Sequence, residues 1–148
     1  MSAEERAAGT VVTGVIGEDV HVVGIRIIEH ALTAAGFKVH SLGAQVAKEE
    51  FIQAALETAA DAILVSSFSG HAELLAESFR EMCVEAGLPD VILYIGGYLG
   101  VSEEPWEEVE ARFRRLGFDR VYPPGTSPNR VVQDLSGDLA SRRRRAAG

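Results

Sequence analysis

Short apolar segments alternate with segments of helical periodicity along most of the chain, and this alternation constrains the fold more than any other feature. The apolar segments are rich in β-branched or aromatic residues, which is typical of buried strands. They are Thr10–Ile16, Phe37–Leu42, Asp61–Ser66, Val91–Ile95 and Phe118–Tyr122. The predicted helices are His21–Ala35, Lys48–Ala60, about His71 to Ala86, Pro105 to Gly117, and Pro128 to about Leu139. No hairpin signal joins neighbouring strands, so each strand is expected to reach the next through a helix.

This order of elements predicts an α/β fold with one doubly wound sheet, because parallel neighbours need crossover connections. We expect five parallel strands in flavodoxin-like (Rossmann-like) order, 2-1-3-4-5. Every predicted strand is followed by a turn of small or polar residues, and these turns meet at the carboxyl edge of the sheet, where such folds bind ligands. The turns are Gly17–Val20, Gly43–Gln45, Ser66–Gly70, Gly96–Gly100 and Pro123–Ser127. A ligand at that edge would contact residues far apart in the sequence.

Composition narrows the class of protein. The 148 residues carry 14 basic and 22 acidic side chains, a formal charge of −8, which argues against nucleic acid or an anionic membrane as the main partner. A single cysteine, Cys83, allows no internal disulfide and favours a cytoplasmic location. No apolar stretch reaches membrane-spanning length. We expect one domain over residues 10–140, between a polar leader (1–9) and a basic, disordered tail (141–148).

The loop after the first strand carries the strongest candidate site. Asp19 and His21 stand where the strand passes to a helix, and Gly24 follows one helical turn after Val20. One interpretation makes Asp19 a helix cap and His21 an exposed first-turn residue. The other makes His21 a metal ligand whose second nitrogen donates to Asp19. A single imidazole supplies one coordination bond, which suits a metal already held by a cofactor.

Two other ligand classes that bind at this edge fit the sequence poorly. A phosphorylated receiver domain needs an acceptor aspartate after the third strand and a lysine after the fifth, where this chain has Ser66 and Pro123. A flavodoxin needs a hydroxyl-rich phosphate loop, but residues 17–21 include two carboxylates, which repel phosphate. We therefore set both classes aside.

Two further pairs of residues have an ordinary and a functional interpretation. Ser66 and Ser67 either finish a strand or offer a hydroxyl to a ring nitrogen of a buried cofactor. Gly96 and Gly97 either form a turn or let a flat ligand lie against the backbone.

Taken together, these motifs resemble one known signature. The order Asp19-Val20-His21-Val22-Val23-Gly24, Ser66-Ser67-Phe68 and Gly96-Gly97 is similar to that of cobalamin-binding domains of the base-off, His-on class. The likeness narrows to the small subunits of adenosylcobalamin-dependent glutamate mutases (methylaspartate mutases). It extends through Gly14–Gly24, Ala62–Glu73, Leu93–Phe113 and Arg120–Thr126.

The resemblance implies a set of cofactor contacts. His21 would be the lower axial cobalt ligand and Asp19 its hydrogen-bond acceptor, while the displaced nucleotide tail of the cofactor would enter a slot beside the sheet. The implied contacts are Glu18, Asp19, Val20, His21, Val22, Gly24, Ser66, Ser67, Phe68, Gly96, Gly97, Tyr98, Leu99, Gly100, Val101 and Ser102. The residues that differ from those usual in the family are Glu18, Val20, Phe68, Tyr98 and Ser102.

The resemblance also implies an activity that this chain does not perform alone. A separate large barrel-type catalytic subunit, in a heterotetramer or similar assembly, would bind glutamate and rearrange it to 3-methylaspartate by radical chemistry with adenosylcobalamin. The predicted edge has no cluster of arginines for a dicarboxylate, which agrees with that division of labour. The alternatives are the cobalamin-binding subunit of another carbon-skeleton mutase and a non-catalytic cobalamin carrier or sensor.

Overall fold

A single parallel sheet forms the centre of the molecule. The computed structural model describes residues 8–17, 22–68, 72–100 and 103–147. The strands are β1 (Thr10–Val15), β2 (Lys38–Ser41), β3 (Ala62–Ser67), β4 (Ile92–Gly97) and β5 (Arg120–Tyr122). Their order is β2-β1-β3-β4-β5, and every neighbouring pair is parallel. The predicted fold class and strand order are therefore confirmed.

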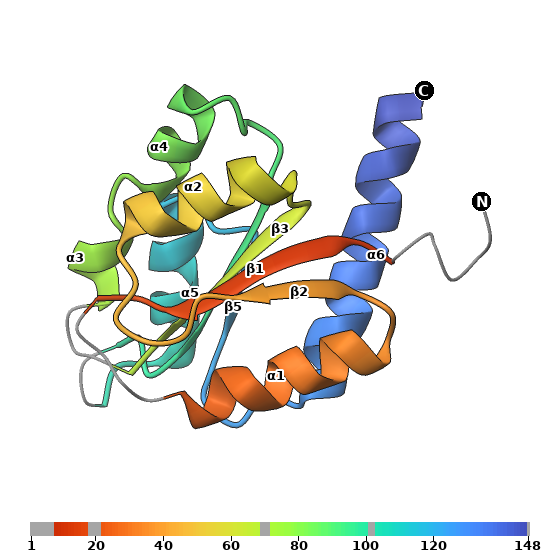
Figure 1. Cartoon of the computed structure of the whole chain (residues 1–148). Coiled ribbons are helices and arrows are strands. Elements are labelled where there is room, and N and C mark those ends of the chain that lie inside the picture. Colours follow the sequence, from red (N-terminus) through yellow and green to blue (C-terminus); the bar gives the residue numbers. More distant parts are fainter. Residues whose placement is uncertain (1–7, 18–21, 69–71, 101–102, 148) are drawn as a thin grey trace.

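Helices cover both faces of the sheet (Figure 1). One face carries α1 (Val23–Ala34) and α6 (Pro128–Ala147). The other carries α2 (Lys48–Thr58), α3 (Ala72–Ala76), α4 (Phe79–Glu85) and α5 (Trp106–Arg115). Within the described residues, no helix combines the length and the apolar character that a membrane span requires.

Two apolar layers hold the helices to the sheet, because successive residues of a strand point to opposite faces. On β3, Ile63 and Val65 pack in the layer under α2 to α5, while Ala62 and Leu64 pack in the layer under α1 and α6. The central strands are thus buried on both sides, which explains their continuous apolar sequences.

The helix predicted from about His71 to Ala86 is in fact two helices, α3 and α4. Between them Ser78 adopts a left-handed conformation with a φ of 65°, which interrupts the helical hydrogen bonds. Ala76 and Phe79, on either side of Ser78, are both fully buried. Tertiary packing sets this break, and the apolar periodicity of the segment gave no sign of it.

The last helix is longer than predicted, because α6 continues past Leu139 to Ala147. Residues 141–147, expected as a disordered tail, are the last two turns of this helix in the structure. Arg142 explains the extension: it donates to Asp61 Oδ1 over 2.6 Å and to the carbonyl oxygens of Asp61 and Asp90 over 3.0 Å. Asp61 precedes β3 and Asp90 precedes β4, so one arginine holds the end of α6 at the amino edge of the sheet.

Candidate functional site

The carboxyl edge of the sheet brings together four of the predicted site residues. Ser66 lies opposite Gly96 and Ser67 lies opposite Gly97, at the ends of β3 and β4. Both serines are buried, with 7% and 0% of their surface exposed. Ser66 also lines a groove beside the sheet.

Gly97 lets the two strand ends approach closely. Its φ is +115°, a conformation that favours glycine. A Cβ atom at this position would lie 2.0 Å from the Ser67 carbonyl oxygen, far inside van der Waals contact. A Cβ atom at Gly96 would meet the Tyr122 Cβ at 3.3 Å, which is tight but much less severe. Of the pair, Gly97 is the position where the backbone itself requires glycine.

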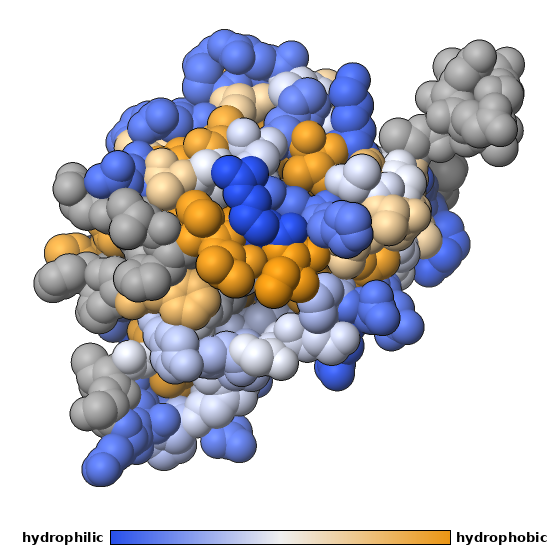
Figure 2. Space-filling model, turned by 60° about the horizontal axis from the view of Figure 1, so that its bottom comes forward, coloured by the Kyte–Doolittle hydropathy of each residue, from blue (hydrophilic) through white to orange (hydrophobic). Residues whose placement is uncertain are grey.

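The groove has a volume of about 260 Å³ and lies between α1, the ends of β3 and β4, and the turn that leads into α6. Apolar residues gather on the face of the molecule that α1 presents (Figure 2). No charged side chain is among the described residues that line the groove. They are Gly24, Ile25, Ile27, Ile28, Leu64, Val65, Ser66, Phe68, Tyr94, Ile95, Gly96, Gly97, Tyr122, Pro123, Pro124, Gly125, Thr126, Ser127, Pro128 and Val131. Such a lining suits a flat, largely apolar ligand.

An aromatic pair stands at the same edge. The rings of Phe68 and Tyr98 are tilted, with centroids 5.3 Å apart, and Tyr98 is 61% exposed. Phe68 also faces the start of α1, since a Cβ atom at Gly24 would lie 3.6 Å from its ring. The structure thus brings Gly24, Phe68 and Tyr98 together, although they come from α1 and from the turns after β3 and β4.

Other predicted contacts lie elsewhere or outside the described residues. Leu99 is 4% exposed and packs in the layer under α5. Gly100 is also close to α5, because a Cβ atom there would meet Val109 at 2.7 Å. The structure therefore does not bring these two residues to the groove. Glu18, Asp19, Val20, His21, Val101 and Ser102 lie outside the described residues.

The two ends of the 18–21 loop are described. Gly17 follows β1 and donates its backbone N–H to the Val46 carbonyl over 2.8 Å. Val22 precedes α1 and accepts a hydrogen bond from the Arg26 N–H over 3.0 Å. Gly17 comes just after β1 and Val22 just before α1, so the two residues that border 18–21 lie at the carboxyl edge. Among the residues described, no group of three or more histidine, cysteine or acidic side chains is placed to hold a metal.

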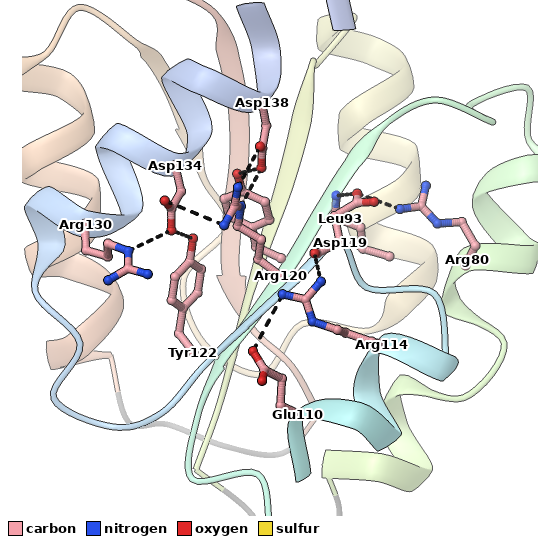
Figure 3. Close-up of polar contacts among 11 residues, drawn as sticks. Arg80, Leu93, Glu110, Arg114, Asp119, Arg120, Tyr122, Arg130, Asp134 and Asp138 are labelled. Atoms are coloured by element: carbon pink, nitrogen blue, oxygen red, sulfur yellow. Dashed lines mark hydrogen bonds and ion pairs between the residues drawn. The ribbon is translucent and has the colours of Figure 1, made fainter. Parts of the chain in front are cut away.

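Two tyrosines that the sequence analysis missed line the groove. Tyr94 of β4 and Tyr122 of β5 pack edge to face, with ring centroids 5.6 Å apart. The Tyr94 hydroxyl donates to Asp138 of α6. The Tyr122 hydroxyl donates to Asp134 of α6 over 2.7 Å (Figure 3). Burial raises the pKa of both hydroxyls, which keeps them protonated as donors. The Pro-Pro-Gly turn after Tyr122 indicated that this residue ends a strand at the carboxyl edge. No feature of the sequence indicated that Tyr94 contacts α6.

Asp138→Asn is expected to lower the free energy of unfolding near pH 7 by about 1 kcal/mol. The loss is smaller than for a fully buried charged hydrogen bond, because the Asp138 carboxyl is partly exposed. Arg120 donates to both Asp138 oxygens, over 2.7 and 2.9 Å, and holds the pKa of that carboxyl below its ordinary value of 3.8. A lowered folded-state pKa stabilises the protein above the unfolded-state pKa, and this stabilisation is lost as the pH falls through the folded-state value. The difference between wild type and variant should therefore shrink in acid. Urea unfolding at about pH 7 and about pH 3 measures it, and an equal difference at both values contradicts the prediction.

A larger groove, of about 850 Å³, lies at the opposite, amino edge of the sheet and is rich in arginine. Most of its guanidinium groups already bind the protein. Arg80 donates to the Gly117 carbonyl and to Asp119, each over 3.0 Å, and Arg142 donates to Asp61. None of the predicted site residues lines it. Its greater volume therefore does not mark it as the site.

Comparison with known proteins defines the class. Residues 9–132 match the B12 binding domain family. A cobalamin-binding protein from Desulfitobacterium hafniense shares the fold with a TM-score of 0.71, at 22% identity over 88% of this chain and 58% of that chain. The monomethylamine corrinoid protein of Methanosarcina barkeri has a TM-score of 0.70, at 20% identity over 90% of this chain and 59% of that chain. This chain is thus a member of the B12-binding domain family.

The family can be stated more narrowly. The glutamate mutase sigma subunit of Carboxydothermus hydrogenoformans is 55% identical over 86% of this chain and 93% of that protein. The sigma subunit of Clostridium tetani is 50% identical over 88% of this chain and 95% of that protein. The chain belongs to the glutamate mutase sigma subunit family, as the motifs in its sequence predicted.

Proposed function

We propose that this chain binds cobalamin and serves as the small subunit of a glutamate mutase, which rearranges L-glutamate to 3-methylaspartate. The observation that carries the proposal is the uncharged groove, which runs from the glycine pair of the carboxyl edge along α1 to the start of α6. Its isoleucine, tyrosine and proline side chains suit the flat base of a displaced nucleotide tail. Membership of the B12-binding domain and sigma subunit families supports the same ligand.

In this proposal His21 is the lower axial ligand of cobalt and Asp19 accepts a hydrogen bond from its imidazole. Such a carboxylate fixes the histidine tautomer and raises the basicity of the nitrogen that binds the metal. Glu18, Val20 and Val22 flank these two residues in the sequence and would contact the corrin ring. The contacts proposed for residues 66–68, 96–98, 101 and 102 complete the site.

The cofactor form in the proposal is adenosylcobalamin, which supplies radical chemistry through its weak cobalt–carbon bond. The work of this chain is to hold the tail in the groove and the cobalt at His21. No described residue that lines the groove carries a charge to bind a dicarboxylate such as glutamate. We therefore assign substrate binding and catalysis to a separate large barrel-type subunit, in a heterotetramer or similar assembly. Cys83 is buried as a free thiol, which agrees with a cytoplasmic location.

A titration followed by an assay tests the proposal. The purified chain is titrated with cobalamin and the visible spectrum is followed, and a saturable base-off, His-on change is expected. The chain is then mixed with adenosylcobalamin and the large subunit of a glutamate mutase, and 3-methylaspartate is expected only when both proteins are present. A spectral change without any product would support a carrier or sensor instead. No spectral change, with or without the large subunit, would contradict cobalamin binding itself.

Gly24→Ala is expected to lower cobalamin affinity about tenfold while stability stays level or rises by up to about 1 kcal/mol. Gly24 is the second residue of α1 and lines the groove, so an added methyl group takes space from the ligand. It would meet Phe68 only at 3.6 Å, an ordinary contact, so the free protein tolerates it. Thermal unfolding and the spectral titration measure the two effects.

Gly137→Ala is the matched control for this prediction. Gly137 lies in α6, and a Cβ atom there would have no neighbour within 4 Å. Gly137→Ala should therefore show the same gain in stability from helix propensity, with unchanged cobalamin affinity. Equal affinities for the two variants would show that Gly24 does not limit the space for the ligand.

A further inference from the structure

The two walls of the groove are α1 and the beginning of α6, and the position of α6 is set by polar contacts as well as by packing. Pro128 and Val131 of α6 line the groove. One helical turn after Val131 comes Asp134, and Asp138 follows another turn later. These two carboxylates accept the hydroxyl hydrogen bonds of Tyr122 and Tyr94, whose rings line the same groove. Hydrogen bonds therefore connect α6 to the two tyrosines of the groove.

Arg120 joins both carboxylates (Figure 3). It binds Asp138 with two nitrogens and lies 3.7 Å from an Asp134 oxygen. Aspartates four residues apart on one helix face repel each other, and an arginine between them removes that repulsion. A bidentate arginine–carboxylate pair also fixes direction, because the planar guanidinium matches the two oxygens. Arg120 is the first residue of β5, so it connects the sheet to α6. With Asp138 it also lines the larger groove at the amino edge, and it reaches the smaller groove only through its partners.

We propose that Arg120 is a positioning residue for the nucleotide tail of the cofactor: through Asp134 and Asp138 it holds α6 and the two tyrosine rings at the separation that the tail requires. This inference rests on the proposed function. Arg120 is not among the residues that line the groove, so its effect on the ligand passes through the other four side chains. The role predicts a defect confined to corrinoids that carry a tail.

Cobinamide, a corrinoid without the nucleotide tail, provides the test. Dissociation constants for aquocobalamin and for aquocobinamide are measured by visible spectroscopy on wild type and on Arg120→Gln. Cobalamin affinity should fall about tenfold, equivalent to about 1.4 kcal/mol, while cobinamide affinity stays within about twofold. An equal loss for both corrinoids, or unchanged cobalamin affinity in a folded variant, overturns the inference.

Arg80→Gln is the matched control. Arg80 makes a comparable set of bonds, to Asp119 and to the carbonyl oxygens of Gly117 and Val91, but it lies in α4 on the opposite face of the sheet. It should not change the ratio of the two affinities. A change in that ratio as large as that of Arg120→Gln would make general destabilisation the explanation and overturn the inference.

Tyr122→Phe tests the same link without removing a charge. It keeps the ring in the groove and deletes only the hydroxyl that donates to Asp134. Cobalamin affinity should fall relative to cobinamide affinity in this variant too, which decides the question if Arg120→Gln does not fold. An unchanged ratio in Tyr122→Phe then overturns the inference. If wild type gives no spectral change with either corrinoid, the proposed function fails with it, whereas a wild-type change with unaltered selectivity in the variants overturns the positioning role alone.

Discussion

Gly97→Ala is expected to destabilise the folded chain by about 3 kcal/mol or more. The added methyl group would lie 2.0 Å from the carbonyl oxygen of Ser67, a backbone atom in the neighbouring strand. Relief requires β3 and β4 to separate where both strands end, because no flexible side chain can move aside. The φ of +115° adds strain for any residue with a Cβ atom. Urea unfolding followed by circular dichroism measures the loss.

Gly43→Ala separates the clash from the backbone strain. Gly43 also has a positive φ, of +80°, but a Cβ atom there would have no neighbour within 4 Å. Its substitution should cost only the strain of a left-handed conformation, about 1 kcal/mol. Similar losses in the two variants would mean that β3 and β4 are free to separate at this edge, contrary to the contact in the structure.

Much of the fold follows from the alternation of apolar and helical segments. Parallel strands need crossovers, and strands buried on both faces have continuous apolar sequences, so a parallel α/β sheet could be predicted. Its strand order was chosen by analogy with flavodoxin-like folds. The break at Ser78 and the extension of α6 could not. Each depends on a contact across the fold: the burial of Ala76 and Phe79 in one case, and the bonds of Arg142 to Asp61 in the other. Apolar periodicity predicts which face of a segment is buried. It does not predict the long-range contacts that interrupt or extend a helix.

The candidate site divides in the same way. Ser66, Ser67, Gly96 and Gly97 could be predicted to meet, because the carboxyl ends of neighbouring parallel strands share one edge. Tyr94 could not be assigned to the groove, since its hydrogen-bond partner Asp138 lies 44 residues further along the chain. The same limit applies to Arg120. Residues that meet at neighbouring strand ends are therefore more predictable than the side-chain hydrogen bonds that connect β4 and β5 to α6.

His21→Ala is expected to abolish the base-off, His-on spectrum and to weaken cobalamin binding more than about a hundredfold. Removing a partner that merely orients a metal ligand typically costs ten- to a hundredfold, and the variant removes the ligand itself. Asp19→Asn should then have the smaller effect, about tenfold, because the imidazole remains but loses its orienting carboxylate. Spectral titration of both variants beside wild type measures the order of the effects.

His30→Ala is the control for His21→Ala, since His30 is an exposed histidine of α1 and does not line the groove. It should bind cobalamin as wild type does. A His-on spectrum that survives in His21→Ala would mean that another residue binds cobalt. A base-on complex in wild type would mean that the nucleotide base stays on cobalt and never enters the groove. In that case Arg120→Gln and Gly24→Ala should also leave cobalamin affinity unchanged, so the three variants together decide whether the loop and the groove act on one ligand.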